Sequence, residues 1–101
     1  MAHVPLFSDY ETVAASQTDQ ALGPTGNRGD VLERLIITVN VAATATASIK
    51  DGTAGASIPI VPATTPVGVY SITIGAKSAA AGGWLVTTGA GLTVLAVGRF
   101  T

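Results

Sequence analysis

The strongest constraint on the fold is the apolar segment VLERLIITVNV, residues 31–41. Asp30 and Glu33 have the spacing of a helix capping box, and the apolar residues within 31–36 could share one helix face. Against a helix, apolar and polar residues alternate after Arg34, and a β-branched run fills 36–39. The alternating apolar residues are Leu35, Ile37, Val39 and Val41. We therefore predict a strand.

Short apolar segments separated by turn formers recur along the rest of the chain. The predicted strands are 11–17, 45–52 closing in a turn at Asp51-Gly52, 56–62, 69–76, 84–88 and 92–100. The strand at 56–62 is expected at a sheet edge because Pro59 has no N–H to donate. Residues 18–30 are rich in turn formers and predict a loop. Regular short strands are typical of a β-sandwich or barrel.

The length and the charge of the chain argue against several classes of function. With 101 residues, the chain has room for one core, and we expect a single domain over 11–101. Net charge is −1 without a basic block, which argues against nucleic-acid binding. No apolar run is long enough for a membrane-spanning helix, and no cysteine offers a disulfide or thiolate ligand. Charged residues make up 11%, and such a low-charge surface predicts a homo-oligomer, a dimer or trimer, or a larger assembly.

The C-terminal segment, residues 82–101, is uncharged except at Arg99. Residues 82–101 are predicted to form a hairpin whose second strand is buried on both faces. Leu92, Val94 and Ala96 share one face, which suits the core. Leu95 and Val97 share the other, which needs a second cover such as a neighbouring subunit. We therefore take Leu95 and Val97 as interface candidates.

Residues 1–10, MAHVPLFSDY, show neither helix nor strand periodicity, and Pro5 opposes a helix. We predict an extended N-terminal arm. Its apolar side chains are Val4, Leu6, Phe7 and Tyr10. Segments that stay in water are poor in such residues. The arm is therefore predicted to become ordered on a partner, either a larger shell or an adjacent subunit.

Several motifs have simpler structural interpretations. Arg28-Gly29-Asp30 spells an integrin-binding tripeptide, but we interpret it as a structural loop in which Asp30→Glu would be close to neutral. Asp51 is interpreted as part of a hairpin turn, since no second carboxylate lies nearby for a cation. Trp84 is more typical of a core anchor than of a sugar-stacking platform.

Catalytic machinery is not predicted. His3 is the one histidine and lies in the arm, so acid–base and metal sites lack partners for it. Ser71 and Ser78 have no neighbouring histidine to activate them. We expect no enzyme activity, no metal and no cofactor.

Four blocks carry a family resemblance: LERLI, IKDG, GAKSAAAGGW and TTGA, in this order across residues 16–101. With them the chain resembles small virion proteins of tailed bacteriophages, in particular head decoration, or cement, proteins with jelly-roll-like sandwiches. The compact middle, residues 53–70, departs from that pattern. The resemblance implies a jelly-roll-like antiparallel β-sandwich of seven or eight strands. It also implies a place on the outer surface of the capsid, bound to the major capsid protein and stabilising the head.

A second function stays open on the sequence. The chain could be a tail, baseplate or fibre component that binds a host-surface glycan. That function needs an exposed aromatic or carboxylate pocket, and Trp84, Tyr10 and Tyr70 are the aromatic residues that could serve it.

Overall fold

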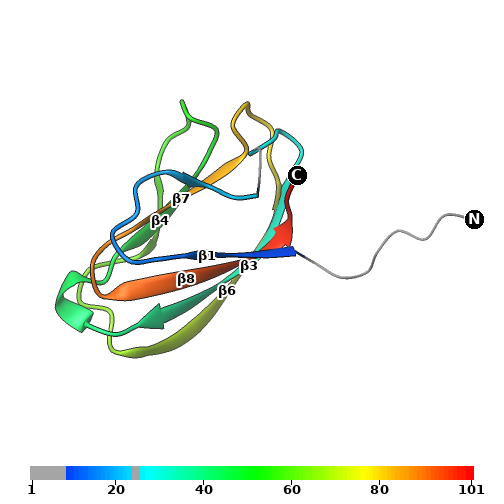
Figure 1. Ribbon diagram of the computed structural model, residues 1–101. Coiled ribbons are helices and arrows are strands. Elements are labelled where there is room, and N and C mark those ends of the chain that lie inside the picture. Colours follow the sequence, from blue (N-terminus) through cyan, green and yellow to red (C-terminus); the bar gives the residue numbers. More distant parts are fainter. Residues whose placement is uncertain (1–8, 24–25) are drawn as a thin grey trace, which may run out of the picture.

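The computed structural model describes residues 9–23 and 26–101, and within them the protein is an all-β sandwich of two antiparallel four-stranded sheets (Figure 1). The strands are β1 (Asp9–Val13), β2 (Gln20–Ala21), β3 (Val31–Val39), β4 (Ala47–Asp51), β5 (Ile58–Val61), β6 (Gly68–Lys77), β7 (Trp84–Thr88) and β8 (Leu92–Arg99), with a 3₁₀ turn at Ala42–Thr44. Sheet A has the order β1-β8-β3-β6, and sheet B has the order β2-β7-β4-β5. This is the winding of an eight-stranded jelly roll, which confirms the predicted fold class.

The strand prediction for residues 31–41 is confirmed, and the helix alternative is wrong. β3 pairs with β6 on one side and β8 on the other. Leu32 and Leu35 both point into the core, although they are three residues apart, because the register shifts between Leu32 and Arg34. A β-bulge of this kind inserts one extra residue into the strand. Val41 belongs to the alternating apolar set, but it is 52% exposed. It lies past the strand end, where its N–H and that of the preceding residue donate to the Gly91 carbonyl.

The predicted hairpin over residues 82–101 is wrong. β7 belongs to sheet B and β8 to sheet A, so the connection at residues 89–91 crosses the sandwich instead of reversing within one sheet. Gly91 makes this crossing possible, because it has φ +90° and any Cβ there would lie 2.7 Å from the Val41 carbonyl oxygen. Within the described residues, β4 and β5 are the only two hydrogen-bonded strands that are consecutive in the chain.

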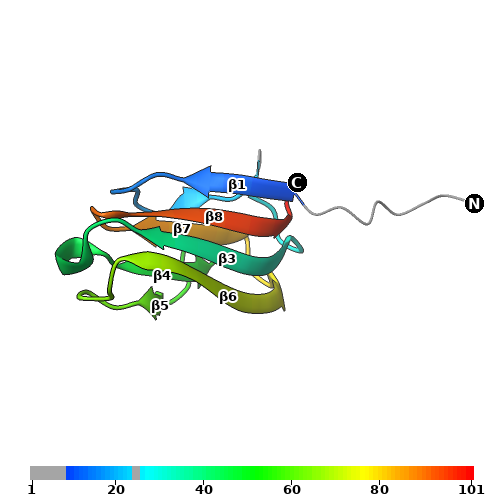
Figure 2. The ribbon, with the colours of Figure 1, turned by 90° about the horizontal axis from the view of Figure 1, so that it is seen from below.

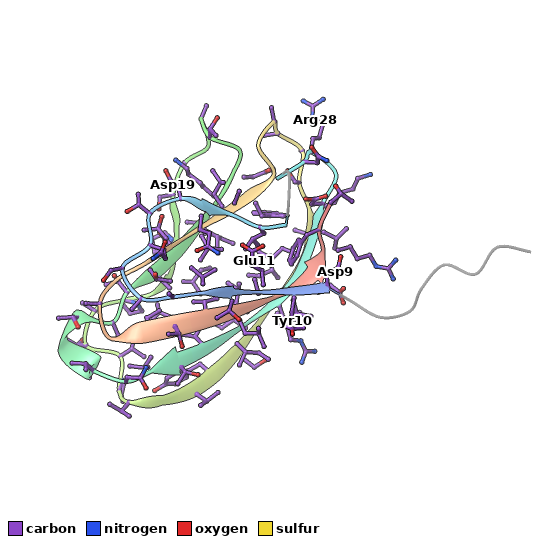
Figure 3. All side chains as sticks on the ribbon, viewed as in Figure 1. Asp9, Tyr10, Glu11, Asp19 and Arg28 are labelled. Atoms are coloured by element: carbon purple, nitrogen blue, oxygen red, sulfur yellow. The ribbon has the colours of Figure 1, made fainter. Side chains whose placement is uncertain are left out.

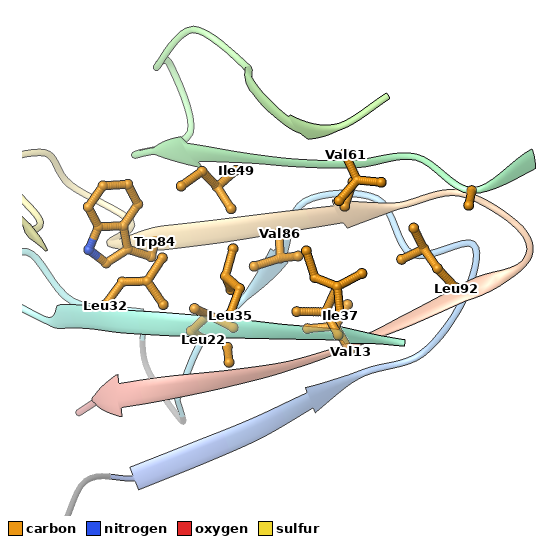
Figure 4. Packing of buried hydrophobic residues seen from close by; sticks show 14 of the residues in the cluster. Val13, Leu22, Leu32, Leu35, Ile37, Ile49, Val61, Trp84, Val86 and Leu92 are labelled. Carbon is orange, nitrogen blue, oxygen red and sulfur yellow. The ribbon is translucent and has the colours of Figure 1, made fainter. Parts of the chain in front are cut away.

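The core lies between the two sheets (Figure 4). It is formed by Val13, Leu22, Leu32, Leu35, Ile37, Val39, Ala45, Ala47, Ile49, Val61, Trp84, Val86, Leu92, Val94, Ala96 and Phe100. Trp84 is 5% exposed, which confirms its prediction as a core anchor. Leu92, Val94 and Ala96 also face the core as predicted, because alternate residues of β8 point inward.

Residues 20–21, predicted as loop, form the short strand β2, and both ends of β1 differ from the predictions. β1 begins at Asp9, so the last two residues of the predicted arm are strand. The Asp9 carboxylate fixes this end of β1 by accepting a hydrogen bond from the Phe100 N–H at 3.1 Å. The strand expected over 11–17 ends at Val13, since the chain turns at Ser16, where φ is 61°. β5 lies at the edge of sheet B, as Pro59 predicted.

Candidate protein–protein interface

The outer face of sheet A brings together the interface candidates that the structure describes. Tyr10 of β1 lies directly opposite Val97 of β8, and Thr12 lies opposite Leu95. Directly paired residues of antiparallel strands point to the same side of the sheet. Tyr10 is 72% exposed, and Leu95 and Val97 are half-buried. The other three candidates, Val4, Leu6 and Phe7, lie outside the described residues.

The sheet register adds apolar residues that sequence reasoning did not select. Ile36 of β3 lies beside Leu95, and Val69 of β6 lies in the next row beside Thr38. The outward direction of both side chains follows from the alternation along a strand. Because Leu35 and Ile37 point inward, Ile36 must point outward, and Val69 likewise precedes the inward Tyr70. The strand order decides that Ile36 then adjoins Leu95, and no local pattern contains that order.

Polar groups on this face are mostly uncharged. Arg34 is exposed and lies beside Val97 near the centre, and Lys77 and Arg99 flank Val31 at one end. Glu33 lies next to Arg34 at the β3 bulge and is half-buried. The other polar side chains in these rows are hydroxyls: Thr12, Thr38, Ser71, Thr73 and Thr93. This face is therefore apolar and hydroxylated apart from Arg34 and Glu33 near its middle and Lys77 and Arg99 at one end.

Sheet B has a different outer surface. Lys50 of β4 forms an ion pair with Asp19 at 3.0 Å. The hydrogen bond from Lys50 lowers the pKa of Asp19, and a hydrogen bond from Thr87 adds to it against the opposing effect of desolvation. Charges of both signs are therefore already paired on this side, which suits a solvated surface.

A carboxylate links the two sheets along one side of the sandwich. Glu11 of β1 points between the sheets, as Figure 3 shows, and accepts hydrogen bonds from Gln20 Nε2 at 2.7 Å and the Gly23 N–H at 2.8 Å. These contacts tie the β1 edge of sheet A to the β2 end of sheet B.

The opposite side of the sandwich is open. A groove of about 380 Å³ lies there between β5 and β6. Its lining residues are Ile60, Val61, Pro62, Thr65, Val69, Tyr70, Ser71 and Ile72. The Tyr70 hydroxyl donates to the Pro66 carbonyl at 2.7 Å, so it is already partnered. The groove contains no charged side chain.

The Arg28-Gly29-Asp30 motif is a structural loop, as predicted. Asp30 is 4% exposed, so its carboxylate is not presented to a receptor. It accepts hydrogen bonds from the Asn27 N–H and from both the N–H and the hydroxyl of Thr101. Because Asp30 is buried and accepts these bonds, we now expect Asp30→Glu to lower stability, in place of the near-neutral effect expected from the sequence.

Asp51 and Ser78 also have structural roles. The Ser78 hydroxyl, which is buried, and the Ala79 N–H both donate to the Asp51 carboxylate. These bonds fasten the end of β4 to the loop before β7. In the part of the chain that the structure describes, no three His, Cys, Asp or Glu residues gather as a metal site, and no helix is long and apolar enough to cross a membrane.

Comparisons with known proteins give no relative. No protein-family model matches the chain, and no curated protein and no solved structure matches it. The resemblance to phage decoration proteins therefore stays a prediction.

Proposed function

We propose that the protein is a structural virion component, a capsid decoration or cement protein that binds the major capsid protein on the outer surface of a phage head and stabilises it. The observation that carries the proposal is the outer face of sheet A. It presents Tyr10, Leu95, Val97 and Ile36 with a row of hydroxyls and one central cation. Apolar surface of this kind is typical of interaction sites.

The charge pattern favours a foreign partner on this face over a second copy. In a two-fold face-to-face pair, Arg34 near the centre of the face would come close to its own copy, and like charges across an interface are unfavourable. A capsid surface with a carboxylate opposite Arg34 would instead supply a complementary charge.

Such binding would stabilise the head by mass action. A protein that binds the assembled lattice, and not the separate subunits, adds its binding free energy to the stability of the assembly. Many copies on one lattice multiply this contribution, and linked contacts raise the effective concentration of each. No chemistry is needed for this role, and the described carboxylates are engaged in structural contacts.

The glycan-binding alternative loses its best aromatic residue. Trp84 is buried in the core, and the Tyr70 hydroxyl is bonded within its own chain. Tyr10 is exposed, but it lies on the outer face of sheet A and does not line the groove between β5 and β6.

The test is cosedimentation of the purified protein with phage heads that lack decoration protein. We expect Val97→Lys to weaken occupancy about tenfold or more, because it places a cation beside Arg34. The matched control is Ser48→Lys on sheet B, which should bind like wild type. Absence of binding to heads, or equal loss in both variants, would contradict the proposal, and retention on host-cell envelopes would favour the glycan alternative.

A further inference from the structure

The four edge strands of the two sheets differ in how well they are protected against pairing with another chain. β1 directs two carboxylates inward, Asp9 and Glu11, each bonded to a backbone N–H. β2 has two residues, and β5 has four, including Pro59. Inward charges, short strands and prolines are the devices by which soluble proteins prevent their edges from pairing with other chains.

β6 has a β-bulge near its C-terminal end, where the register with β3 shifts and Gly75 has φ 63°. It carries none of the other devices. It is ten residues long, contains no proline, and has no charge before Lys77 at its end. The preceding stretch, residues 52–67, is also uncharged. In the part of the chain that the structure describes, no strand pairs with its outer side, so the backbone groups there can pair with another strand.

The side chains of β6 are also incompletely covered. Tyr70, Ile72 and Ile74 point inward but are only half-buried, whereas the inward residues of β3 and β8 are buried. Val69 is 69% exposed and Val67, just before the strand, is 65% exposed. Figure 2 shows β5 and β6 on the same side of the sandwich, where the apolar groove between them opens.

We propose that two copies of this chain associate through their β6 edges, in antiparallel register about a two-fold axis. The two four-stranded A sheets then form one continuous sheet. Rows of half-buried Tyr70, Ile72 and Ile74 from the two copies adjoin on its inner face. A register centred on Ile72, for example, places Tyr70 opposite Ile74 of the other copy and covers both grooves from the side.

Charge and symmetry favour a second copy of the chain as the partner of the β6 edge. The antiparallel arrangement keeps the two Lys77 ammonium groups at opposite ends of the pair, about 30 Å apart for a strand of this length. A two-fold axis makes the interface self-complementary, so each copy satisfies the backbone groups of the other. The inference concerns the free protein and does not depend on the capsid role, because it uses β6 and leaves most of the outer face of sheet A uncovered.

The first test measures the oligomeric state of the full chain by sedimentation equilibrium. We expect a dimer for the wild type and a dissociation constant raised about tenfold or more in Ser71→Lys, which places two cations at the centre of the pair. Thr12→Lys is the matched control, since Thr12 is an exposed hydroxyl residue of β1 at the opposite edge of sheet A. A monomeric wild type would overturn the proposal, as would equal effects of the two lysines.

The second test uses the absence of cysteine from the chain. An equimolar mixture of Ser71→Cys and Thr73→Cys variants should form disulfide-linked dimers under mild oxidation, because these exposed residues lie near the proposed axis. The Thr12→Cys variant should stay uncrosslinked. Crosslinking that is no faster in the mixture than in Thr12→Cys would show that β6 is not the contact, independently of any effect of lysine on folding.

Discussion

At the residue scale, Trp84 combines a large contribution to the core with an unsatisfied polar group. Its ring lies between the sheets beside Leu32 (Figure 4), and its indole N–H has no hydrogen-bond partner among the described residues. We expect Trp84→Ala to lower the free energy of unfolding by about 3–5 kcal/mol through the cavity that it leaves. Trp84→Phe should lose less, since it keeps an aromatic ring and removes an N–H that is costly to bury. Urea unfolding of both variants measures the difference, and equal losses would contradict this account.

Asp30 has a stabilising role that the Arg28-Gly29-Asp30 motif does not indicate. It joins the 26–30 loop to the chain end through bonds to Asn27 and Thr101. Because hydrogen bonds to charged groups contribute about 1.5–3 kcal/mol each, we expect Asp30→Ala to lose at least that much stability. Arg28→Ala is the control within the same motif, because Arg28 is exposed and surface substitutions usually change stability by less than about 0.5 kcal/mol. Thermal melts that rank Arg28→Ala as the more damaging variant would refute the structural interpretation.

At the element scale, Asp51 connects the end of β4 to the loop before β7. Burial raises the pKa of Asp51, but hydrogen bonds from Ser78 and from the backbone of Ala79 and Ala80 outweigh it, with help from the charge of Arg28, and the pKa lies below the ordinary 3.8. A lowered pKa stabilises the fold above the unfolded-state value, and this contribution is lost as pH falls through the folded-state pKa.

The difference in unfolding free energy between wild type and Asp51→Asn should therefore be largest near neutral pH and shrink as the pH falls below 3.8. Denaturant unfolding across this range is the measurement. A difference that is constant with pH would show that Asp51 acts through packing and not through its charge.

At the scale of the whole molecule, the sandwich and the N-terminal segment should be separable. Deleting residues 1–8 removes Val4, Leu6 and Phe7 but leaves β1 complete from Asp9, with its bond to Phe100. We expect the truncated protein to melt like the full chain by circular dichroism and to occupy decoration-free phage heads more weakly. Burial of a large apolar side chain contributes about 1.5–3 kcal/mol, part of which is spent on ordering the backbone. Unchanged occupancy would remove the segment from attachment, and a collapsed melt would assign it to the fold.

Local patterns in the sequence determined most of the strands. Alternation and β-branched residues specified β3, and Pro59 placed β5 at an edge, because these features act on the backbone of their own segment. The inward face of β8 was also readable, since side chains alternate with period two in any strand. The low fraction of charged residues led to the expectation of an assembly, and the lack of partners for His3 led to the expectation of no catalysis. Both stay predictions.

The tertiary structure alone decided which segments meet. Residues 82–101 have the local pattern of a hairpin, yet β7 and β8 lie in different sheets, because the jelly roll pairs β7 with β2 and β4 and pairs β8 with β1 and β3. The same winding brings Ile36 beside Leu95 and leaves β6 at an open edge. The bulge in β3 and the burial of Asp30 likewise depend on partners far away in sequence. Periodicity reports the environment of one strand, whereas the identity of its neighbours is set by how all the apolar faces are buried together.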